Sequence, residues 1–249
     1  MADTTHRSPR LYIERDLDDS SLELDEAEAH YLGHVLRLTR GDPLIVFNGL
    51  GVEREASVSS LQRRAATLAL HATRLPKPDS PLALTLVQAL PKSDAMDLIV
   101  QKSTELGVHT LVPVYTEFSV VKLDSERSER RVAHWRKIAR SACEQCGRHA
   151  PPRIEPPQPL ADALATLPAA ARRLALDPGG ELALGEQASP GSQLVAAVGP
   201  EGGFGATDWR RLDAAQFARV SLGQRVLRAE TAALALCAIA QARWGDLRG

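Results

Sequence analysis

Two glycine-containing segments in the C-terminal third of the chain have the spacing of ligand-binding loops. Gly199-Pro200-Glu201-Gly202-Gly203 follows an apolar run at 192–198 and precedes a predicted helix. The segment LGQRVLRAET at 222–231 follows the apolar run at 217–222 and also leads into a helix. Glycine lets the backbone approach a ligand closely, and open α/β sheets bind ligands beyond the carboxyl ends of their strands. We therefore expect these two loops to form one composite pocket.

The residues within these loops limit the chemistry of the pocket. Neither loop has the G-x-G-x-x-G pattern or the lysine of a phosphate-binding loop. Glu201 would repel a phosphate, so the first loop favours a neutral or cationic ligand. A tight strand-to-helix turn explains the spacing of that loop equally well. Arg225, Arg228 and Glu230 crowd into the second loop, although Glu230 taken alone also fits a helix cap with one ion pair.

Other reactive side chains give weaker patterns. Cys143 and Cys146 form a C-x-x-C, but a zinc site needs a second ligand pair at suitable spacing. We expect these two cysteines, like Cys237, to be inert helix residues and expect no metal. His30 and His34 lie four residues apart without a third ligand, and the chain has no G-x-S-x-G element of a hydrolase.

The composition excludes several classes of protein. The chain has 249 residues, of which 44% are apolar and only 4% aromatic, so we expect an aliphatic core. It has no long apolar run and no apolar leader, and its cysteines number three, which together predict a cytoplasmic protein without a membrane span. The net charge is −1, but nine Lys or Arg stand against four Asp or Glu between Lys122 and Arg153. An anionic partner would bind there first, although a solvated helix face is the simpler explanation of the charges.

The first eighty residues predict a small β domain. The segment at 24–37 reads as a short helix in which Asp25 is the N-cap and Glu28 its capping-box partner. Short strands with an Asn48-Gly49 turn follow. Three prolines at 75–81 mark a linker. We therefore assign residues 1–76 to a β-barrel domain and 77–249 to a second domain.

The second domain alternates strands and helices, which predicts an α/β fold with a parallel sheet. Ser93 or Asp94 is expected to cap the first helix, Gly107 to end it, and Thr207 to cap a later one. The predicted strands lie at 82–90, 109–114, 172–177, 192–198 and 217–222, and the long predicted helices begin at Ser125 and near Thr231.

The chain resembles the RsmE family of SPOUT-class methyltransferases, which methylate N3 of a uridine in small-subunit ribosomal RNA. The resemblance rests on LYI at 11–13, HYLGHVLRLTRGD at 30–42, LPKSDAMDLIVQKSTELGV at 90–108, EQCGR at 144–148, VGPEGGF at 198–204 and SLGQRVLRAETAAL at 221–234. The combination of GPEGG with LGxRxLRxET is specific, and the six segments span nearly the whole chain. Cys146 and Ala229 are minor departures from the family pattern.

This resemblance implies an N-terminal PUA-like β-barrel that holds RNA and a C-terminal α/β domain with a deep trefoil knot. It also implies a homodimer that takes part in ribosome biogenesis and binds S-adenosylmethionine in the knot. No pattern in the residues themselves predicts a knot, because knotted chains are rare. The residues that the resemblance assigns to the cofactor are Leu176, Gly199, Pro200, Glu201, Gly202, Gly203, Leu222, Gly223, Gln224, Leu227 and Ala229.

The transfer to N3 needs stabilisation of a uridinate and removal of its proton. We expect Arg228 or Arg225 to stabilise the negative charge on the uracil oxygens, and Glu230 or Glu201 to be the base. RNA contacts should be mainly with phosphate. The candidates for them are Arg10, Arg37, Lys92, Lys102 and Arg148, with Arg153 a weaker one.

Two alternatives stay open at this point. The chain could be another SPOUT methyltransferase, which acts on a ribose 2′-oxygen or on tRNA. It could also be an RNA-binding factor of ribosome assembly without catalytic activity, although such a factor would have no need of the glycines in both loops.

Overall fold

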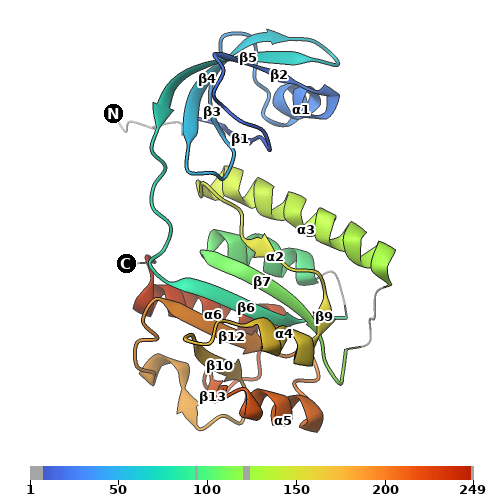
Figure 1. Cartoon of the computed structure of the whole chain (residues 1–249), viewed down its shortest axis with the longest axis vertical. Coiled ribbons are helices and arrows are strands. Elements are labelled where there is room, and N and C mark those ends of the chain that lie inside the picture. Colours follow the sequence, from blue (N-terminus) through green and yellow to red (C-terminus); the bar gives the residue numbers. More distant parts are fainter. Residues whose placement is uncertain (1–7, 93–94, 120–123, 248–249) are drawn as a thin grey trace. The chain divides into compact units, whose positions relative to one another are not determined.

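The computed structural model describes residues 8–92, 95–119 and 124–247. These divide into two compact units, of which the first comprises Met1–Pro78 with Cys143–Ala150 and the second Asp79–Ala142 with Pro151–Gly249. No pattern in the residues predicts that Cys143–Ala150 groups with the first unit. Figure 1 shows the elements of both units along the chain.

The first unit is a curled five-stranded sheet with one short helix. Its elements are β1 (Arg10–Tyr12), β2 (Ser21–Leu24), α1 (Glu26–His30), the π-helical turn η1 (Tyr31–Val35), β3 (Pro43–Phe47), β4 (Glu53–Leu61) and β5 (Ala66–Arg74). The strand order is β1-β3-β4-β5-β2, in which β1 and β3 are parallel and the other neighbours antiparallel. This is the PUA-like architecture that the family resemblance implied.

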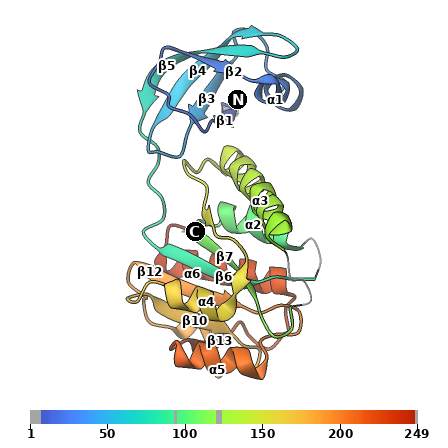
Figure 2. The same cartoon turned by 45° about the vertical axis from the view of Figure 1, so that its right-hand side comes forward.

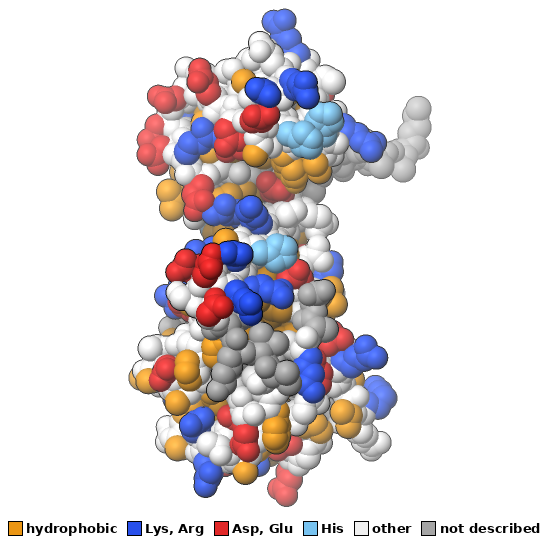
Figure 3. Space-filling model, turned by 90° about the vertical axis from the view of Figure 1, so that its right-hand side faces the viewer, with side chains coloured by type: hydrophobic (Ala, Val, Ile, Leu, Met, Phe, Trp, Pro, Cys, Tyr) orange, Lys and Arg blue, Asp and Glu red, His pale blue; other side chains and the backbone are white. Residues whose placement is uncertain are grey.

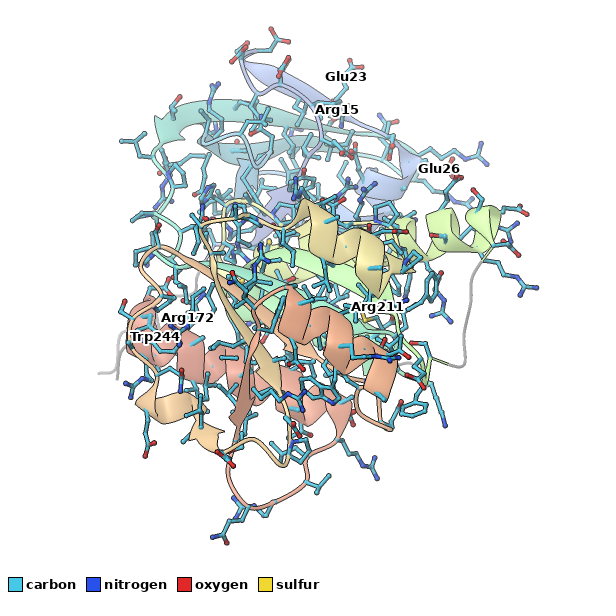
Figure 4. All side chains as sticks on the ribbon, turned by 60° about the horizontal axis from the view of Figure 1, so that its bottom comes forward. Arg15, Glu23, Glu26, Arg172, Arg211 and Trp244 are labelled. Carbon is cyan, nitrogen blue, oxygen red and sulfur yellow. The ribbon has the colours of Figure 1, made fainter. Side chains whose placement is uncertain are left out.

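Local signals in the sequence explain how this unit begins its helix. The Asp25 side chain accepts a hydrogen bond from the Glu28 N–H at 2.8 Å, and Glu28 accepts one from the Asp25 N–H at 3.0 Å. The predicted capping box is therefore confirmed. Arg15, labelled with Glu23 and Glu26 in Figure 4, donates to the Glu23 carbonyl at 2.8 Å. The helix covers an aliphatic core that includes Leu32, Val46 and Leu68.

A half-buried carboxylate ties the residues after Ala142 to the first unit. Glu144 accepts a hydrogen bond from the Tyr12 N–H at 2.9 Å and another from the Tyr31 hydroxyl at 2.7 Å. Burial raises the pKa of Glu144, although these two hydrogen bonds and the charge of Arg10 oppose that shift.

The second unit is a three-layer α/β structure. Its strands are β6 (Ala83–Ala89), β7 (Val108–Tyr115), β8 (Arg153–Ile154), β9 (Gln158–Pro159), β10 (Arg172–Leu176), β11 (Leu182–Ala183), β12 (Gln193–Val198) and β13 (Ala218–Ser221). Its helices are α2 (Ala95–Glu105), α3 (Ser125–Cys146), α4 (Leu160–Thr166), the 3-10 turn η2 (Leu184–Glu186), α5 (Ala206–Ala214) and α6 (Ala229–Trp244). The last four residues of α3 group with the first unit.

The sheet of the second unit runs β11-β13-β10-β12-β6-β7-β8, and every paired neighbour is parallel. Helices α2, α3 and α6 cover one face through residues such as Ile99, Trp135 and Leu236. Helices α4 and α5 cover the other face through Leu160 and Leu212 (Figure 2). Because both faces are buried, the central strands are continuous apolar runs, as the sequence predicted. No described helix is long and apolar enough to cross a membrane.

One helix start differs from the prediction. The N-cap of α5 is Gly205, not Thr207. The Gly205 N–H donates to Asp208 at 3.1 Å, while the Thr207 N–H donates to Glu117, which lies 90 residues away. The expectation for Thr207 was therefore wrong, because a distant carboxylate takes over the local capping role. The expected caps Ser93 and Asp94 lie outside the described residues, and Gly107 ends α2 with a φ of 75° as predicted.

The raised pKa of Glu144 predicts a pH-dependent stability. The folded protein binds this proton more tightly than the unfolded chain, so the free energy of unfolding falls as pH rises from the ordinary value of 4.5 through the raised pKa. Glu144→Gln removes this titration. We expect wild type to lose stability relative to this variant as the pH rises above 4.5, measured by urea unfolding at a series of pH values. If wild type instead gained stability relative to Glu144→Gln as the pH rose, burial would not be the main influence on the pKa of Glu144.

Candidate active site

A pocket lies at the carboxyl ends of β10, β12 and β13. Its walls are formed by Leu176, Asp177, Pro178, Val198, Gly199, Pro200, Glu201, Gly203, Val220, Leu222, Gly223, Arg225, Val226, Leu227, Ala229 and Ala232. The three strands are neighbours in the parallel sheet, so their carboxyl ends meet at one edge. Most of the lining is aliphatic or backbone, and two carboxylates and one guanidinium contribute charge.

The loop after β12 is folded back on itself. The Gly203 N–H donates to the Pro200 carbonyl at 2.9 Å, and Gly203 has a φ of 73°. A Cβ at Gly199 would lie 3.0 Å from the Gly203 carbonyl carbon and 3.2 Å from the Phe204 nitrogen. Because both neighbours are backbone, a side chain at position 199 would force this loop to shift by a few tenths of an ångström.

The loop after β10 completes a second wall and was identified from the sequence only as the surroundings of Leu176. The Asp177 N–H donates to the Val220 carbonyl at 2.9 Å, and the Asp177 carbonyl accepts from the Gly180 N–H at 2.9 Å. A Cβ at Gly180 would lie 3.0 Å from the Val220 carbonyl carbon. Asp177 was missed as a lining residue, although its place directly after an apolar strand could have indicated it.

The loop after β13 supplies the guanidinium of the pocket. Gly223 has a φ of 104°, which turns the chain out of the strand. Arg225 then lines the pocket together with Val226, which is 81% exposed. Arg228 is the exposed N-cap of α6 and is followed by buried Ala229.

A buried carboxylate fixes the segment that follows the first loop. Asp208, on α5, has no exposed surface and accepts hydrogen bonds from the N–H groups of Glu117 at 2.9 Å and Gly205 at 3.1 Å. Its other oxygen lies 3.9 Å from Nη1 of Arg211, which Figure 4 labels. The Glu117 carboxylate in turn accepts from the Thr207 N–H at 3.0 Å. The segments after β7 and β12 are therefore joined by two hydrogen bonds, from the Glu117 N–H to Asp208 and from the Thr207 N–H to Glu117.

The structure brings most of the predicted pocket residues together. Those that line it are Leu176, Gly199, Pro200, Glu201, Gly203, Leu222, Gly223, Leu227 and Ala229 from the cofactor set and Arg225 from the catalytic set. Gly202, Gln224, Arg228 and Glu230 are not among the lining residues. Glu201 also accepts a hydrogen bond from the Lys92 N–H at 3.0 Å, which connects the loops after β6 and β12.

The structure removes Arg10 from the RNA-contact candidates. Its guanidinium is 9% exposed and bonded to both carboxylate oxygens of Glu53, at 2.5 and 3.1 Å. It also donates to the Arg148 carbonyl at 3.2 Å and lies 4.4 Å from the centre of the Phe47 ring. A phosphate could reach Arg10 only by breaking this buried pair, so the expectation for this residue is corrected.

The other candidates differ in how available they are. Arg37 is exposed, with a φ of 56°, and Lys92 is exposed beside Glu201. Lys102 pairs with Glu105 at 2.8 Å, whereas the side chain of Arg148 is half-buried. The weaker candidate, Arg153, pairs with Glu155 at 2.8 Å. Lys122, at the start of the basic stretch, lies outside the described residues.

A larger hollow opens at the opposite edge of the sheet, where β6, β7 and β12 begin. It lies at the amino ends of the strands, so it does not fit the rule that places ligands beyond their carboxyl ends. Within the described ranges, no group of three or more His, Cys, Asp and Glu side chains could hold a metal ion. The thiol of Cys237 is buried, and burial raises its pKa to about 12, which makes it unreactive at neutral pH.

Comparison with known proteins gives consistent matches along the chain. A family model described as the RNA methyltransferase domain matches residues 78–241, and one described as the RNA methyltransferase PUA domain matches residues 24–70. A ribosomal RNA small subunit methyltransferase E from Rickettsia conorii is 32% identical over 94% of this chain and 94% of its own length. Its counterpart from Bacillus subtilis is 31% identical over 85% of this chain and 86% of its own.

Solved structures extend the similarity to three dimensions. The ribosomal RNA small subunit methyltransferase E from Neisseria gonorrhoeae, bound to S-adenosyl methionine, is 33% identical with a TM-score of 0.89. That match covers 97% of this chain and 100% of the other. A protein from Legionella pneumophila, solved in complex with the same cofactor, is 33% identical with a TM-score of 0.90. This match also covers 97% of this chain and 100% of the other.

The crowding at Gly199 predicts a specific cost for a side chain there. Gly199→Ala should lower the free energy of unfolding by about 1–3 kcal/mol, because the new Cβ meets backbone that cannot move independently. Gly185→Ala is the matched control, since nothing lies within 4 Å of a Cβ at that position. Urea unfolding of both variants checks the expectation, which an equal effect of the two substitutions would contradict.

Proposed function

The chain belongs to the RNA methyltransferase family that contains the ribosomal RNA small subunit methyltransferase E proteins, and we propose on this basis that it transfers a methyl group from S-adenosylmethionine to RNA of the small ribosomal subunit. The observation that carries the proposal is the near-complete match to a relative solved with this cofactor. The pocket at the carboxyl ends of three parallel strands gives the ligand a place in this chain.

We extend the proposal to N3 of one uridine in 16S ribosomal RNA, methylated by a cytoplasmic homodimer. The support for this finer statement is the co-occurrence of GPEGG at 199–203 and LGQRVLRAET at 222–231, the combination specific to the family that the sequence resembles. The trefoil knot that this resemblance implies stays a prediction.

The pocket suits the cofactor in its lining and in its charge. Aliphatic side chains such as Leu176 and Leu222 would pack against the adenosine, while Asp177 and Glu201 offer negative charge to a cationic group. Bound there, S-adenosylmethionine would supply a methyl group on a positively charged sulfur.

The arginines would stabilise negative charge on the uracil oxygens when N3 loses its proton. Arg225 lines the pocket and would reach a base at its edge directly. Arg228 is exposed at the first turn of α6, three residues further along the same loop. We propose that Arg225 and Arg228 share the stabilising role, and that Arg225 also contacts the bound ligand because it lines the pocket.

Of the two predicted bases, Glu201 has the better position. Its carboxylate lines the pocket, and the hydrogen bond from the Lys92 N–H holds it there. Glu230 is half-buried in the first turn of α6 and is not among the lining residues. We therefore propose that Glu201 accepts the N3 proton, while Glu230 serves the helix N-terminus.

The RNA would be held mainly through its phosphates. The exposed cations Arg37 and Lys92 are the best placed of the predicted contacts, followed by Lys102, which would have to leave Glu105. Arg148 is a weaker contact because it is half-buried.

The test of this function is methyl transfer to small ribosomal subunits purified from cells that lack the protein, with the modified position mapped by mass spectrometry. We expect one methyl group per subunit, on N3 of a uridine. A methyl group on a ribose 2′-oxygen or on tRNA would support a different RNA methyltransferase. Tight binding of subunits without transfer would support a non-catalytic assembly factor.

Arg228→Ala separates the catalytic role from cofactor binding. We expect kcat to fall by about 10²- to 10³-fold, as for loss of one oxyanion-stabilising group, with the Kd for S-adenosylmethionine changed less than about threefold. Steady-state kinetics and calorimetry give the two values. Arg210→Ala, at an exposed position on α5, is the control. An equal loss in kcat and in cofactor affinity would contradict the role given to Arg228.

A further inference from the structure

An exposed phenylalanine stands beside the glycine loop of the pocket. Phe118 is 48% exposed and lies just beyond β7, in a chain with only four phenylalanines. Single exposed apolar side chains are common on proteins and need no explanation by themselves. What distinguishes Phe118 is where its ring lies and how firmly its backbone is held.

The ring lies beside Gly202 of the GPEGG loop. A Cβ built at Gly202 would lie 3.5 Å from Cδ2 and 3.7 Å from Cγ of Phe118. Gly202 is exposed and does not line the pocket, whereas the residues on both sides of it, Glu201 and Gly203, do. The ring therefore lies next to the pocket but outside it, with about half of its surface free.

The backbone that presents the ring is anchored on both sides. Before it, the Glu117 N–H donates to buried Asp208 at 2.9 Å, and the Glu117 carboxylate accepts from the Thr207 N–H at 3.0 Å. After it, the Ser119 N–H donates to the Thr116 carbonyl at 3.1 Å, and the Ser119 hydroxyl accepts from the Thr116 N–H at 2.9 Å. A backbone segment held in this way loses little conformational freedom on binding a partner.

A lysine lies at the same loop. Lys92, exposed after β6, donates its backbone N–H to Glu201, and the Phe118 ring lies beside Gly202. Two neighbouring strands, β6 and β7, thus lead to a lysine and an aromatic residue at one glycine loop. Single-stranded RNA is bound by this combination, in which cations hold phosphates and aromatic rings stack on bases.

We propose that Phe118 is a positioning residue that stacks on a nucleobase of the RNA segment carrying the target. The inference rests on the proposed function and adds a residue to it. Stacking on phenyl is tolerant of base identity, so Phe118 contributes affinity and orientation, and the pocket selects the base that reacts.

The test compares Phe118→Leu, which keeps an apolar side chain but removes the ring, with Phe118→Trp, which keeps an aromatic ring. With purified subunits as substrate, Phe118→Leu should lower kcat/KM by about 5- to 140-fold, the equivalent of about 1–3 kcal/mol for one stacked base. We expect most of this loss in KM. Phe118→Trp should stay within about threefold of wild type, and its fluorescence should be quenched by added subunits. The Kd of Phe118→Leu for S-adenosylmethionine should stay within about twofold of wild type.

The controls separate stacking from the other uses of an exposed ring. Leu98→Ala alters an exposed apolar residue on α2 and should leave kcat/KM unchanged. The proposal would be overturned if Phe118→Leu were as active as wild type, or if the Leu and Trp variants lost kcat/KM equally. It would also be overturned if Phe118→Leu lost affinity for S-adenosylmethionine as much as it lost kcat/KM. A changed mass in light scattering would overturn it too, because that would assign the ring to a contact between copies of the chain.

Binding of subunits distinguishes failure of this inference from failure of the proposed function. If wild type transfers no methyl group but binds subunits more tightly than Phe118→Leu does, the proposed activity fails and stacking stands. If both proteins transfer and bind alike, stacking fails and the activity stands.

Discussion

The pocket depends on one fully buried carboxylate that lies outside it. Asp208 accepts the N–H groups of Glu117 and Gly205, which belong to segments that follow two different strands, β7 and β12. A buried charge is tolerated only where hydrogen bonds compensate its lost hydration, so Asp208 requires both segments to stay in place. The GPEGG loop is thereby fixed at its far end at Gly205, while β12 fixes its near end. Its shape is determined before any ligand binds.

The loops after β10 and β12 contribute other kinds of group to the pocket than the loop after β13 does. The loops after β10 and β12 are turns in which Gly180 and Gly199 have no room for a side chain. They offer backbone groups and carboxylates in fixed positions. The loop after β13 offers an exposed guanidinium, Arg225, next to a valine that is mostly in solvent. This division suits a site that binds one ligand rigidly and receives a second, larger one from outside.

Much of the architecture could be predicted because local signals and long-range packing agree. The capping box of Asp25 and Glu28, the helix end at Gly107 and the apolar strands all follow from short-range rules. The errors have a common cause. Thr207 lost its cap role to Glu117, and Arg10 is buried against Glu53, 43 residues away. Asp208 and Phe118 were missed for the same reason, since their importance comes from neighbours that only the fold supplies. Asp177 differs from them, because its place directly after an apolar strand could have indicated it.

Internal pairing also decides how this chain can hold an anionic partner. Arg10, Arg153 and Arg219 are held by Glu53, Glu155 and Asp213, so the number of basic residues overstates the positive charge that is free to bind phosphate. Figure 3 shows Lys and Arg side chains interspersed with Asp and Glu in both units. With a net charge of −1, non-specific attraction to RNA is weak and easily screened by salt. Recognition must then come from a few well-placed groups and from the shape of a folded RNA. An exposed aromatic face beside the pocket, on a hydrogen-bonded backbone, meets that need, because stacking on a base does not depend on net charge.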